Sequence, residues 1–495
     1  MRTLTIIVDR ETLVKPIIDA YAYNDVLVMP GFSSVMPSQV NIATKFSRNI
    51  ILGAPLSSSP MDTVTHQKLA IQMALLGGIG ILDRNMSIDQ QCDHVRSVKR
   101  YMSAILTDPY TLRPNNTVAH ARKLMREKVI SGIPITDNNG RLVGIITKHD
   151  LKFDNNNNFA AIKDVMTKDH LITAPIGTTP EQAQQICHAT RIEKLPLVDS
   201  QNVLKGLITL KDTEKKNMFP HATLDSRGQL RVGAAVGAAS NNSDYAERAT
   251  ALIAAGADAI IIDSAHGHSA NVINALITLK KISGMFDVIV GNIATTDAAR
   301  MLCKHGADAV KVGMGPASIC TTRVVTGVGV PQISAIRWAV EGTDDEIPVI
   351  ADGGISFSGD ITKAIAAGAS SVMIGSIFAG TDESPGEKIL YGGRMYTSYR
   401  GMGSEAVLQG GGDRYGGKAV PEGVEGMVPH RGPFALIFEQ LIGGLRQGMW
   451  DAGCASIEEL QKNSILLHVS NAGNRESHVH GVAITKQPPN YQIEQ

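Results

Sequence analysis

The sequence predicts an α/β protein whose main domain is a (β/α)8 TIM barrel. Eight short apolar segments alternate with helical patterns, and each segment ends in glycine or polar residues. In a barrel of this kind the active site lies at the carboxyl ends of the strands, where these polar endings fall. The predicted strands lie within 51–58, 77–85, 231–239, 259–267, 287–295, 308–316, 348–356 and 370–378. Alanine-rich helical patterns stand between them, for example at 244–257 and 295–307.

An internal repeat fills the one long gap, which follows the second predicted strand. Residues 132–150 match residues 194–212 at a fixed offset, with Pro134 against Pro196 and Gly144 against Gly206. Each copy predicts a strand, a helix, a two-stranded hairpin and a helix. The copies resemble tandem cystathionine-β-synthase-type (CBS) modules, a Bateman domain, which implies binding of adenine or guanine nucleotides. A spacer domain without a ligand is the alternative.

These patterns divide the chain into a barrel and an inserted regulatory domain. A glycine-rich segment with little apolar content, at about 405–430, is expected to be a mobile flap. The predicted parts are the first part of the barrel at 1–94, the insert at 95–220 with repeats at about 102–152 and 165–214, and the rest of the barrel at 221–495.

Charge and cysteine content argue against several classes of protein. The 495 residues include 47 Lys and Arg against 47 Asp and Glu, so no obligate nucleic-acid or membrane partner is expected. Five scattered cysteines without a CxxC pair indicate a reducing compartment. Since there is also no signal-peptide pattern and no apolar run of membrane-spanning length, we expect a cytoplasmic protein.

Cys320 is the strongest candidate for a catalytic residue. It lies in the run GMGPASICTT, residues 313–322, directly after a predicted strand. Glycine and proline favour a sharp turn there, and the exposed N–H groups of such a turn can hold a phosphate. A thiol above this cradle can attack a phosphate-bearing substrate. An inert buried cysteine is the alternative, which the glycine-rich position at a strand end disfavours.

Other strand ends supply residues that suit a nucleotide. Gly375 and Ser376 follow the eighth strand, which is a frequent phosphate position in barrels. Ser318 and Tyr399 can donate further hydrogen bonds, and Asp352 can accept hydrogen bonds from ribose hydroxyls. No GxGxxG motif follows the first strand, so a dinucleotide would not bind in the Rossmann manner.

Several segments together resemble the inosine-5′-monophosphate (IMP) dehydrogenase family over essentially the full length. The resemblance implies oxidation of IMP to xanthosine monophosphate (XMP) by NAD⁺ and water, the committed step toward guanine nucleotides. It implies that Cys320 attacks C2 of the purine, that hydride passes to NAD⁺, and that water hydrolyses the covalent thioimidate. The matching segments are 57–65, 263–269, 313–323, 327–332, 351–361, 399–404, 413–426 and 472–491.

The resemblance also implies roles for individual residues. Arg414 and Tyr415 would activate water with help from Thr322, although Arg414 without the resemblance would be interpreted as a substrate clamp. Asp263 would hold the nicotinamide ribose, and the NAD⁺ site would also include Gly313, Met314 and Gly315. The implied IMP-binding residues are Ser318, Asp352, Gly353, Gly354, Gly375, Ser376, Tyr399, Arg400, Gly401, Met402, Gly403 and Glu422, with Glu422 at the N1 edge of the base.

A K⁺ site and a homotetramer are implied in the same way, with an octamer of paired tetramers as a further state. Carbonyl ligands suit such a cation. A zinc site at His478 and His480 is disfavoured, because no cysteine stands near them. The implied K⁺ ligands are the carbonyls of Gly313, Gly315 and Cys320, facing those of Glu476, Ser477 and His478 from a neighbouring subunit.

The sequence departs from the family pattern in three segments. Ala317 replaces the usual glycine, His66 replaces the usual glutamate, and residues 428–432 read VPHRG in place of VPYKG. The methyl group of Ala317 costs little unless this position needs a positive φ.

Two other functions remain open from the sequence. GMP reductase shares the barrel and the cysteine loop, but the CBS pair, the DRY motif at 413–415 and GVGVPQ at 327–332 oppose it. A catalytically idle nucleotide sensor is opposed by the presence of Cys320 and of the DRY motif.

Overall fold

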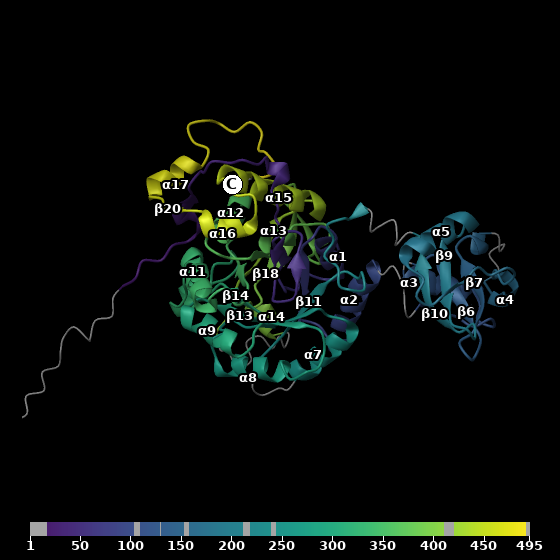
Figure 1. Ribbon diagram of the computed structural model, residues 1–495. Coiled ribbons are helices and arrows are strands. Elements are labelled where there is room, and N and C mark those ends of the chain that lie inside the picture. Colours follow the sequence, from purple (N-terminus) through teal and green to yellow (C-terminus); the bar gives the residue numbers. More distant parts are fainter. Residues whose placement is uncertain are drawn as a thin grey trace, which may run out of the picture.

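The centre of the molecule is a closed barrel of eight parallel strands (Figure 1). The computed structural model describes residues 17–102, 109–128, 130–152, 158–210, 218–238, 244–409 and 420–491. Every segment predicted as a barrel strand contains one, which confirms the fold class. In order around the barrel the strands are β11 (Val232–Val236), β12 (Ala259–Asp263), β13 (Asp287–Ile293), β14 (Ala309–Val312), β15 (Val349–Asp352), β16 (Ser371–Ile374), β4 (Leu56–Ser58) and β5 (Ile79–Leu82).

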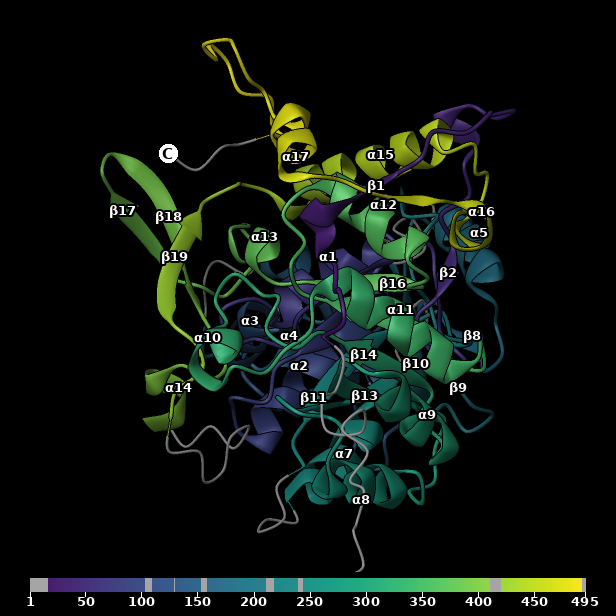
Figure 2. The same cartoon turned by 90° about the vertical axis from the view of Figure 1, so that its left-hand side faces the viewer.

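Helices surround the barrel (Figures 1 and 2), and their buried apolar residues pack with the outward-facing residues of the strands. The alanine-rich patterns at 244–257 and 295–307 correspond to α7 and α9. The barrel helices are α1 (Gln67–Leu75), α2 (Ile88–Tyr101), α7 (Asp244–Ala255), α8 (Ala270–Leu279), α9 (Thr296–Lys304), α11 (Gln332–Thr343), α12 (Ser358–Ala366) and α13 (Ser376–Ala379), and α15 (Phe434–Asp451) packs on α12.

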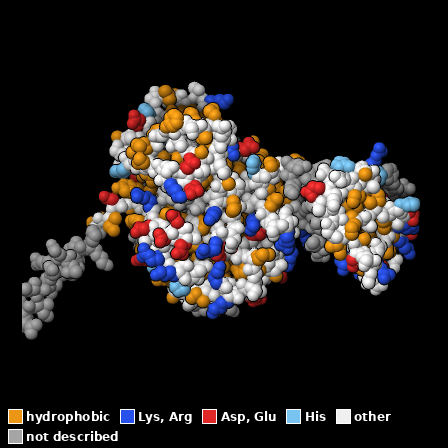
Figure 3. Space-filling model, in the orientation of Figure 1, with side chains coloured by type: hydrophobic (Ala, Val, Ile, Leu, Met, Phe, Trp, Pro, Cys, Tyr) orange, Lys and Arg blue, Asp and Glu red, His pale blue; other side chains and the backbone are white. Residues whose placement is uncertain are grey.

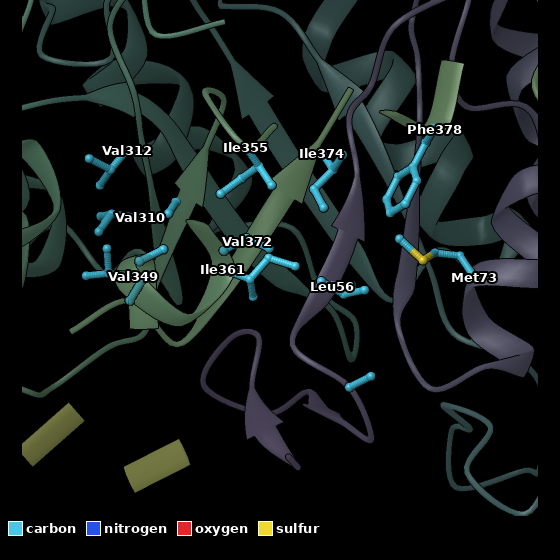
Figure 4. Packing of buried hydrophobic residues seen from close by; sticks show 14 of the residues in the cluster. Leu56, Met73, Val310, Val312, Val349, Ile355, Ile361, Val372, Ile374 and Phe378 are labelled. Atoms are coloured by element: carbon cyan, nitrogen blue, oxygen red, sulfur yellow. The ribbon is translucent and has the colours of Figure 1, made fainter. Parts of the chain in front are cut away.

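Strand residues alternate between two apolar layers, because successive side chains of a strand point to opposite faces. Along β12, Ile260 and Ile262 pack with helix residues, whereas Ala259 and Ile261 belong to the barrel interior. Figure 4 shows the outer layer, where Val372 and Ile374 of β16 lie near Leu56 of β4.

The amino-terminal end of the barrel is closed by an apolar plug. Phe46, Ile50 and Leu52, around β2 (Thr44–Lys45) and β3 (Ile51–Leu52), pack against the interior residues of the strands. Asp287, the first residue of β13, anchors this plug by accepting hydrogen bonds from Ser47 and Asn49. The carboxyl end is therefore the end of the barrel that can hold a ligand.

A smaller unit is inserted between α2 and β11 and stands beside the barrel in Figure 1. Its hairpin strands confirm the repeat, because β9 and β10 follow β6 and β7 at one constant offset. The unit contains α3 (Val118–Glu127), β6 (Gly132–Thr136), β7 (Leu142–Thr147), η4 (Asp150–Lys152), α4 (Ile162–Val165), β8 (Ala174–Pro175), α5 (Pro180–Thr190), β9 (Lys194–Val198) and β10 (Leu204–Thr209).

The two copies are less alike outside the hairpins than the sequence predicts. The first strand of the first copy is reduced to one bridge, between Leu112 and Ile135. The described part of the closing helix of that copy is the short η4, followed by residues 153–157 outside the described residues, and the closing helix of the second copy would fall at 211–217, also outside them.

The predicted boundary between residues 94 and 95 needs correction. Helix α2 continues to Tyr101 and packs on the barrel, with Val95 and Val98 fully buried in the main core. Nζ of Lys99 lies 2.9 Å from Oδ2 of Asp225 and 2.8 Å from Oδ2 of Asp258, just before β12. The barrel domain therefore extends to about residue 102.

An antiparallel sheet and the C-terminal elements complete the barrel domain. The sheet, prominent in Figure 2, consists of β17 (Lys388–Tyr391), β18 (Arg394–Arg400) and β19 (Glu425–Pro429). The mobile flap was expected at about 405–430. Because β19 lies within this range, the carboxyl part of the range is a paired strand, and the expected flap is shorter than predicted. The remaining elements are η2 (Tyr23–Asp25), η3 (Pro37–Gln39), α10 (Thr322–Thr326), α14 (Glu405–Gln409), α16 (Ile457–Asn463), α17 (Asn471–Ser477) and the pair β1 (Val26–Val28) with β20 (Leu466–His468).

The surface charge and the hydropathy of the helices add little to the prediction of function. On the face shown in Figure 3, Lys, Arg, Asp and Glu side chains are interspersed over the barrel. Within the described ranges, no helix combines the length and the apolar character that crossing a membrane requires.

Candidate active site

A cavity of about 290 Å³ lies at the carboxyl end of the barrel strands. Most of the residues predicted for catalysis and for nucleotide binding meet on its wall, although they come from distant parts of the chain. Those on the wall are Asp263, Gly313, Met314, Gly315, Ser318, Cys320, Thr322, Asp352, Gly353, Gly354, Gly375, Ser376, Tyr399, Gly401, Met402, Gly403 and Glu422.

Glycine at position 313 allows the cysteine loop to leave β14 at the required angle. Gly313 has φ +154°, and a Cβ there would lie 2.1 Å from the carbonyl oxygen of Asp352. Only glycine fits such a close backbone approach. Ala317, by contrast, is not among the described residues with positive φ, so its methyl group needs no unusual backbone conformation.

The loop is fixed against the segment before β19. The N–H of Val424 donates to the carbonyl of Ile319 (3.1 Å), and Cys320 pairs with Gly423 as an isolated antiparallel bridge. The N–H of Cys320 donates to the carbonyl of Ala317 (3.0 Å), which closes the turn around the thiol. Two segments about a hundred residues apart thus hold the candidate nucleophile.

The thiol of Cys320 contacts a hydroxyl that is in turn hydrogen-bonded to a carboxylate. Its Sγ lies 3.2 Å from Oγ1 of Thr322, and this hydroxyl donates to Oε2 of Glu422 at 2.8 Å. The carbonyl oxygen of Glu422 lies 3.7 Å from the same Sγ. This arrangement offers a path for a proton between the thiol and the carboxylate.

The other cysteines are poor candidates for a nucleophile. Burial raises the pKa of the Cys92, Cys187 and Cys454 thiols. Burial and the adjacent Glu346 raise the pKa of Cys303 to about 11. A raised pKa disfavours the reactive thiolate, and none of these four residues lies on the cavity wall.

The side of the cavity at β16 combines a close-packed glycine with a neutral phenol. A Cβ at Gly375 would lie 3.0 Å from the hydroxyl oxygen of Tyr399, so a larger residue would crowd this position. Burial raises the pKa of Tyr399, and Ser318 forms a side-chain hydrogen bond with it. The phenol therefore stays protonated at neutral pH and can donate to an anion such as phosphate.

Lys311 and Asn292 line the cavity but escaped the sequence interpretation. Nζ of Lys311 lies 2.5 Å from Oδ2 of Asp352 and 3.1 Å from Oδ1 of Asp263, and it also contacts Oδ1 of Asn292. Nδ2 of Asn292 donates to Oδ2 of Asp352 (3.0 Å) and to the carbonyl of Gly313 (2.8 Å). A lysine inside an otherwise apolar barrel strand was the available signal.

Some predicted residues do not lie on the cavity wall. The guanidinium of Arg400 binds the carboxylate of Asp62, with Nη2 2.5 Å from Oδ2, and this contact raises the pKa of Arg400. Glu476 and Ser477 belong to α17 and His478 follows it; His478 lines a second cavity together with Pro316 of the cysteine loop. Arg414 and Tyr415 lie outside the described residues.

At the position of the family glutamate, His66 precedes α1. Its Nε2 lies 3.3 Å from Oδ1 of Asp83, and its ring is 4.8 Å from that of His94. The substitution therefore places an imidazole against a buried carboxylate, and His66 is not part of the cavity wall.

Comparison with known proteins places this architecture among characterised enzymes. The family model described as IMP dehydrogenase / GMP reductase domain matches residues 20–480. Inosine-5′-monophosphate dehydrogenase of Helicobacter pylori is 49% identical over 480 residues, covering 95% of this chain and 98% of that protein. The enzyme of the same name from Aquifex aeolicus is 47% identical, covering 97% and 99%.

Solved structures of similar chains include GMP reductases. A cysteine-to-alanine variant of GMP reductase from Trypanosoma brucei, in complex with guanosine 5′-monophosphate, superposes with a TM-score of 0.90 at 40% identity. The match covers 96% of this chain and all of that one. The enzyme in complex with guanosine 5′-triphosphate gives 0.79 at 37% identity, covering 92% and 99%. Because these matches span the insert, its presence does not oppose GMP reductase, contrary to our expectation from the sequence.

Proposed function

The chain belongs to the IMP dehydrogenase / GMP reductase family, and from this we propose that it oxidises IMP to XMP with NAD⁺ through a covalent adduct on Cys320. The observation that most directly supports this proposal is the contact of the Cys320 thiol with Thr322, which in turn binds Glu422, on the wall of the barrel cavity. A nucleophile, a hydroxyl and a carboxylate in sequence form the arrangement that covalent catalysis needs.

The chemistry balances as two half-reactions. Sγ of Cys320 adds to C2 of the purine while the thiol proton leaves, and C2 then loses hydride to give a thioimidate. Water adds to that carbon and expels the thiol, so IMP, NAD⁺ and water give XMP, NADH and one proton. Thr322 and Glu422 provide the path for the thiol proton, and Arg414 with Tyr415 would activate the water.

The residues beside Cys320 suit the substrate and the nicotinamide cofactor. Gly375, Ser376 and Tyr399 offer donors for the phosphate of IMP, and Asp352 an acceptor for its ribose. Asp263, which lines the same cavity, offers an acceptor for the ribose of NAD⁺. When bound there, NAD⁺ supplies the hydride acceptor.

A K⁺ ion fits the cysteine loop by the chemistry of its carbonyl groups. The carbonyl of Gly313 already accepts from Asn292, but a carbonyl oxygen has a second lone pair for a cation. Within one chain, His478 and Pro316 of this loop line the same cavity, whereas in the proposed site the carbonyls of the C-terminal segment come from a neighbouring subunit. We include Gly315, Cys320, Glu476 and Ser477 in the proposed site, and a homotetramer would complete it.

GMP reductase is the second candidate, and the observation that favours it is the full-length superposition on the T. brucei enzyme. The identities of 47–49% to the IMP dehydrogenases exceed the 40% to that reductase, which favours oxidation of IMP. For the insert we propose nucleotide binding by the tandem CBS modules, as a regulatory function separate from catalysis.

One pair of assays decides between the candidates. The purified protein is supplied with IMP and NAD⁺ while NADH absorbance is followed, and separately with GMP and NADPH while NADPH is followed. We expect NADH and XMP in the first assay only. Cys320→Ala should bind IMP but form no NADH, whereas Cys303→Ala, a change outside the cavity, should keep the parent rate. NADPH consumption with GMP, or turnover by Cys320→Ala, would contradict the proposal.

A further inference from the structure

One buried ammonium group joins the two carboxylates that we assign to the two ribose sites. Lys311 is on β14, and its side chain is only 1% exposed. Alternation along the strands gives Asp263, Lys311 and Asp352 interior positions on β12, β14 and β15, the same layer as Ile261, Ala309 and Ile350.

Asn292 joins the same layer through an irregularity in its strand. The register of β13 with β14 shifts between Gly291 and Ile293, at Asn292. Such shifts re-aim a side chain and are common beside active sites. Asn292 contacts both Lys311 and Asp352, so the four side chains form one connected network across neighbouring strands.

The network fixes both carboxylates and leaves Oδ1 of Asp352 able to bind a ligand. Lys311 and Asn292 both contact Oδ2 of Asp352, so Oδ1 can accept from a ribose hydroxyl. Lys311 contacts Oδ1 of Asp263, which holds the second carboxylate in place from the same nitrogen. All four residues line the cavity.

Stability is a weak reason for such a network. Burying an ion pair costs desolvation that its attraction barely repays, and apolar replacements of whole buried pairs often stabilise proteins. The interior layer below is apolar, so a further apolar residue would fit the pattern of the barrel. A buried charge cluster in a cavity marks a functional position instead.

We propose that Lys311 is a positioning residue that orients Asp263 for NAD⁺ and Asp352 for IMP, so that one side chain sets the affinity of both ligands. This inference rests on the proposed function, because it takes the two aspartates as the ribose acceptors. Without the ammonium, two carboxylates would face each other in a poorly solvated site, and repulsion would turn them away from the ribose hydroxyls.

The test measures binding without turnover. In a Cys320→Ala background, IMP is titrated alone by calorimetry, and NAD⁺ is titrated at saturating IMP. Lys311→Met removes the charge at similar size, and both dissociation constants should rise about 10- to 100-fold, as for a lost hydrogen bond to a charged group.

Lys99→Met is the matched control. Lys99 is also buried between two aspartates, Asp225 and Asp258, but at the amino-terminal end of β12. It should lower stability like Lys311→Met and leave both dissociation constants unchanged. If Lys311→Met does not fold, Lys311→Gln gives the same test, since its amide can still donate to one carboxylate while the charge is absent.

The outcomes separate this inference from the proposed function. A folded Lys311 variant that binds both ligands as the parent does, or that loses affinity for one ligand only, overturns the joint role. If the protein with Cys320 intact yields no NADH from IMP, the proposed function fails on that result alone. NADH formation together with unchanged affinities in the Lys311 variants would reject only the role of Lys311.

Discussion

Thr322 donates a 2.8 Å hydrogen bond to Glu422 while its hydroxyl oxygen lies 3.2 Å from the sulfur of Cys320. Thr322 is the first residue of the short helix α10, whereas Glu422 stands just before β19, a hundred positions further along the chain. The hydroxyl thus ties the nucleophile to a carboxylate that is only 8% exposed. The geometry of the thiol therefore depends on the segment just before β19.

Thr322→Val should lower turnover at least about tenfold, because it keeps the shape of the side chain and removes the hydroxyl that contacts the thiol. IMP affinity should change little. Thr326→Val is the control, since Thr326 lies one turn later in α10 and its hydroxyl bonds to backbone groups, donating to the carbonyl of Thr322 and accepting from the N–H of Val328. Steady-state NADH formation measures both, and equal rates for the two variants would remove Thr322 from the mechanism.

Arg414→Ala should separate the two half-reactions. In the proposed mechanism, hydride transfer needs Cys320 and the bound nicotinamide, whereas hydrolysis needs activated water. We expect one rapid burst of NADH, near one per active site, followed by slow turnover, as for an accumulating covalent intermediate. Rapid mixing shows the burst, and mass spectrometry of the protein shows the trapped purine nucleotide. Cys320→Ala provides the blank without a burst; an undiminished steady-state rate in Arg414→Ala would refute the assignment.

Stability near neutral pH should depend on His94. Burial, and secondly the neighbouring His66, lower the pKa of His94 below its usual 6.5, with Asp83 acting in the opposite direction. The folded protein therefore holds His94 neutral, and the unfolded chain binds its proton more readily. This contribution is fully present above the unfolded pKa and is lost as pH falls below about 6.5.

His94→Gln removes this pH-dependent contribution to stability, so the melting temperature of the variant should fall less than that of the parent between pH 7.5 and 5.5. His305→Gln, at an exposed position on the barrel surface, should behave as the parent does. Parallel pH dependences of parent and His94→Gln would argue against the buried neutral imidazole.

The parts of the molecule that periodicity governs could be predicted, and the parts that single contacts govern could not. Eight apolar segments gave eight strands because a parallel barrel buries both faces of each strand. The cysteine loop could be predicted because glycine, proline and one thiol stand together at the end of a predicted strand. Lys311 was missed because its role depends on Asp263 and Asp352, which only strand alternation and barrel closure bring to it.

The predicted domain boundary between residues 94 and 95 was wrong for a related reason. Residues 95–101 look like part of a polar, charged segment in the sequence, yet they form the last two turns of α2. Val95 and Val98 face the barrel core, and Lys99 finds its two partners 126 and 159 positions further along. No pattern in the sequence near Lys99 indicates these distant partners.

Two deletions of different length should therefore have opposite effects on folding. Replacing residues 103–217 by a short Gly/Ser linker removes the inserted unit and keeps α2, so the barrel should fold and retain most of its NADH-forming rate. Deleting 95–220 also removes Val95, Val98 and Lys99. Two buried valines contribute about 1.5–3 kcal/mol each, and leaving Asp225 and Asp258 without their lysine costs roughly 3 kcal/mol more.

The larger deletion thus forfeits a free energy comparable to the whole stability of a domain, about 5–15 kcal/mol. It should give insoluble or unfolded protein, whereas the smaller one should melt cooperatively by circular dichroism near the parent temperature. If the insert binds nucleotides as proposed, regulation by them should be lost in the smaller deletion, while Cys320 and its partners remain. If the smaller deletion melts as the parent does but forms no XMP, the insert takes part in catalysis itself and the barrel alone is not the enzyme.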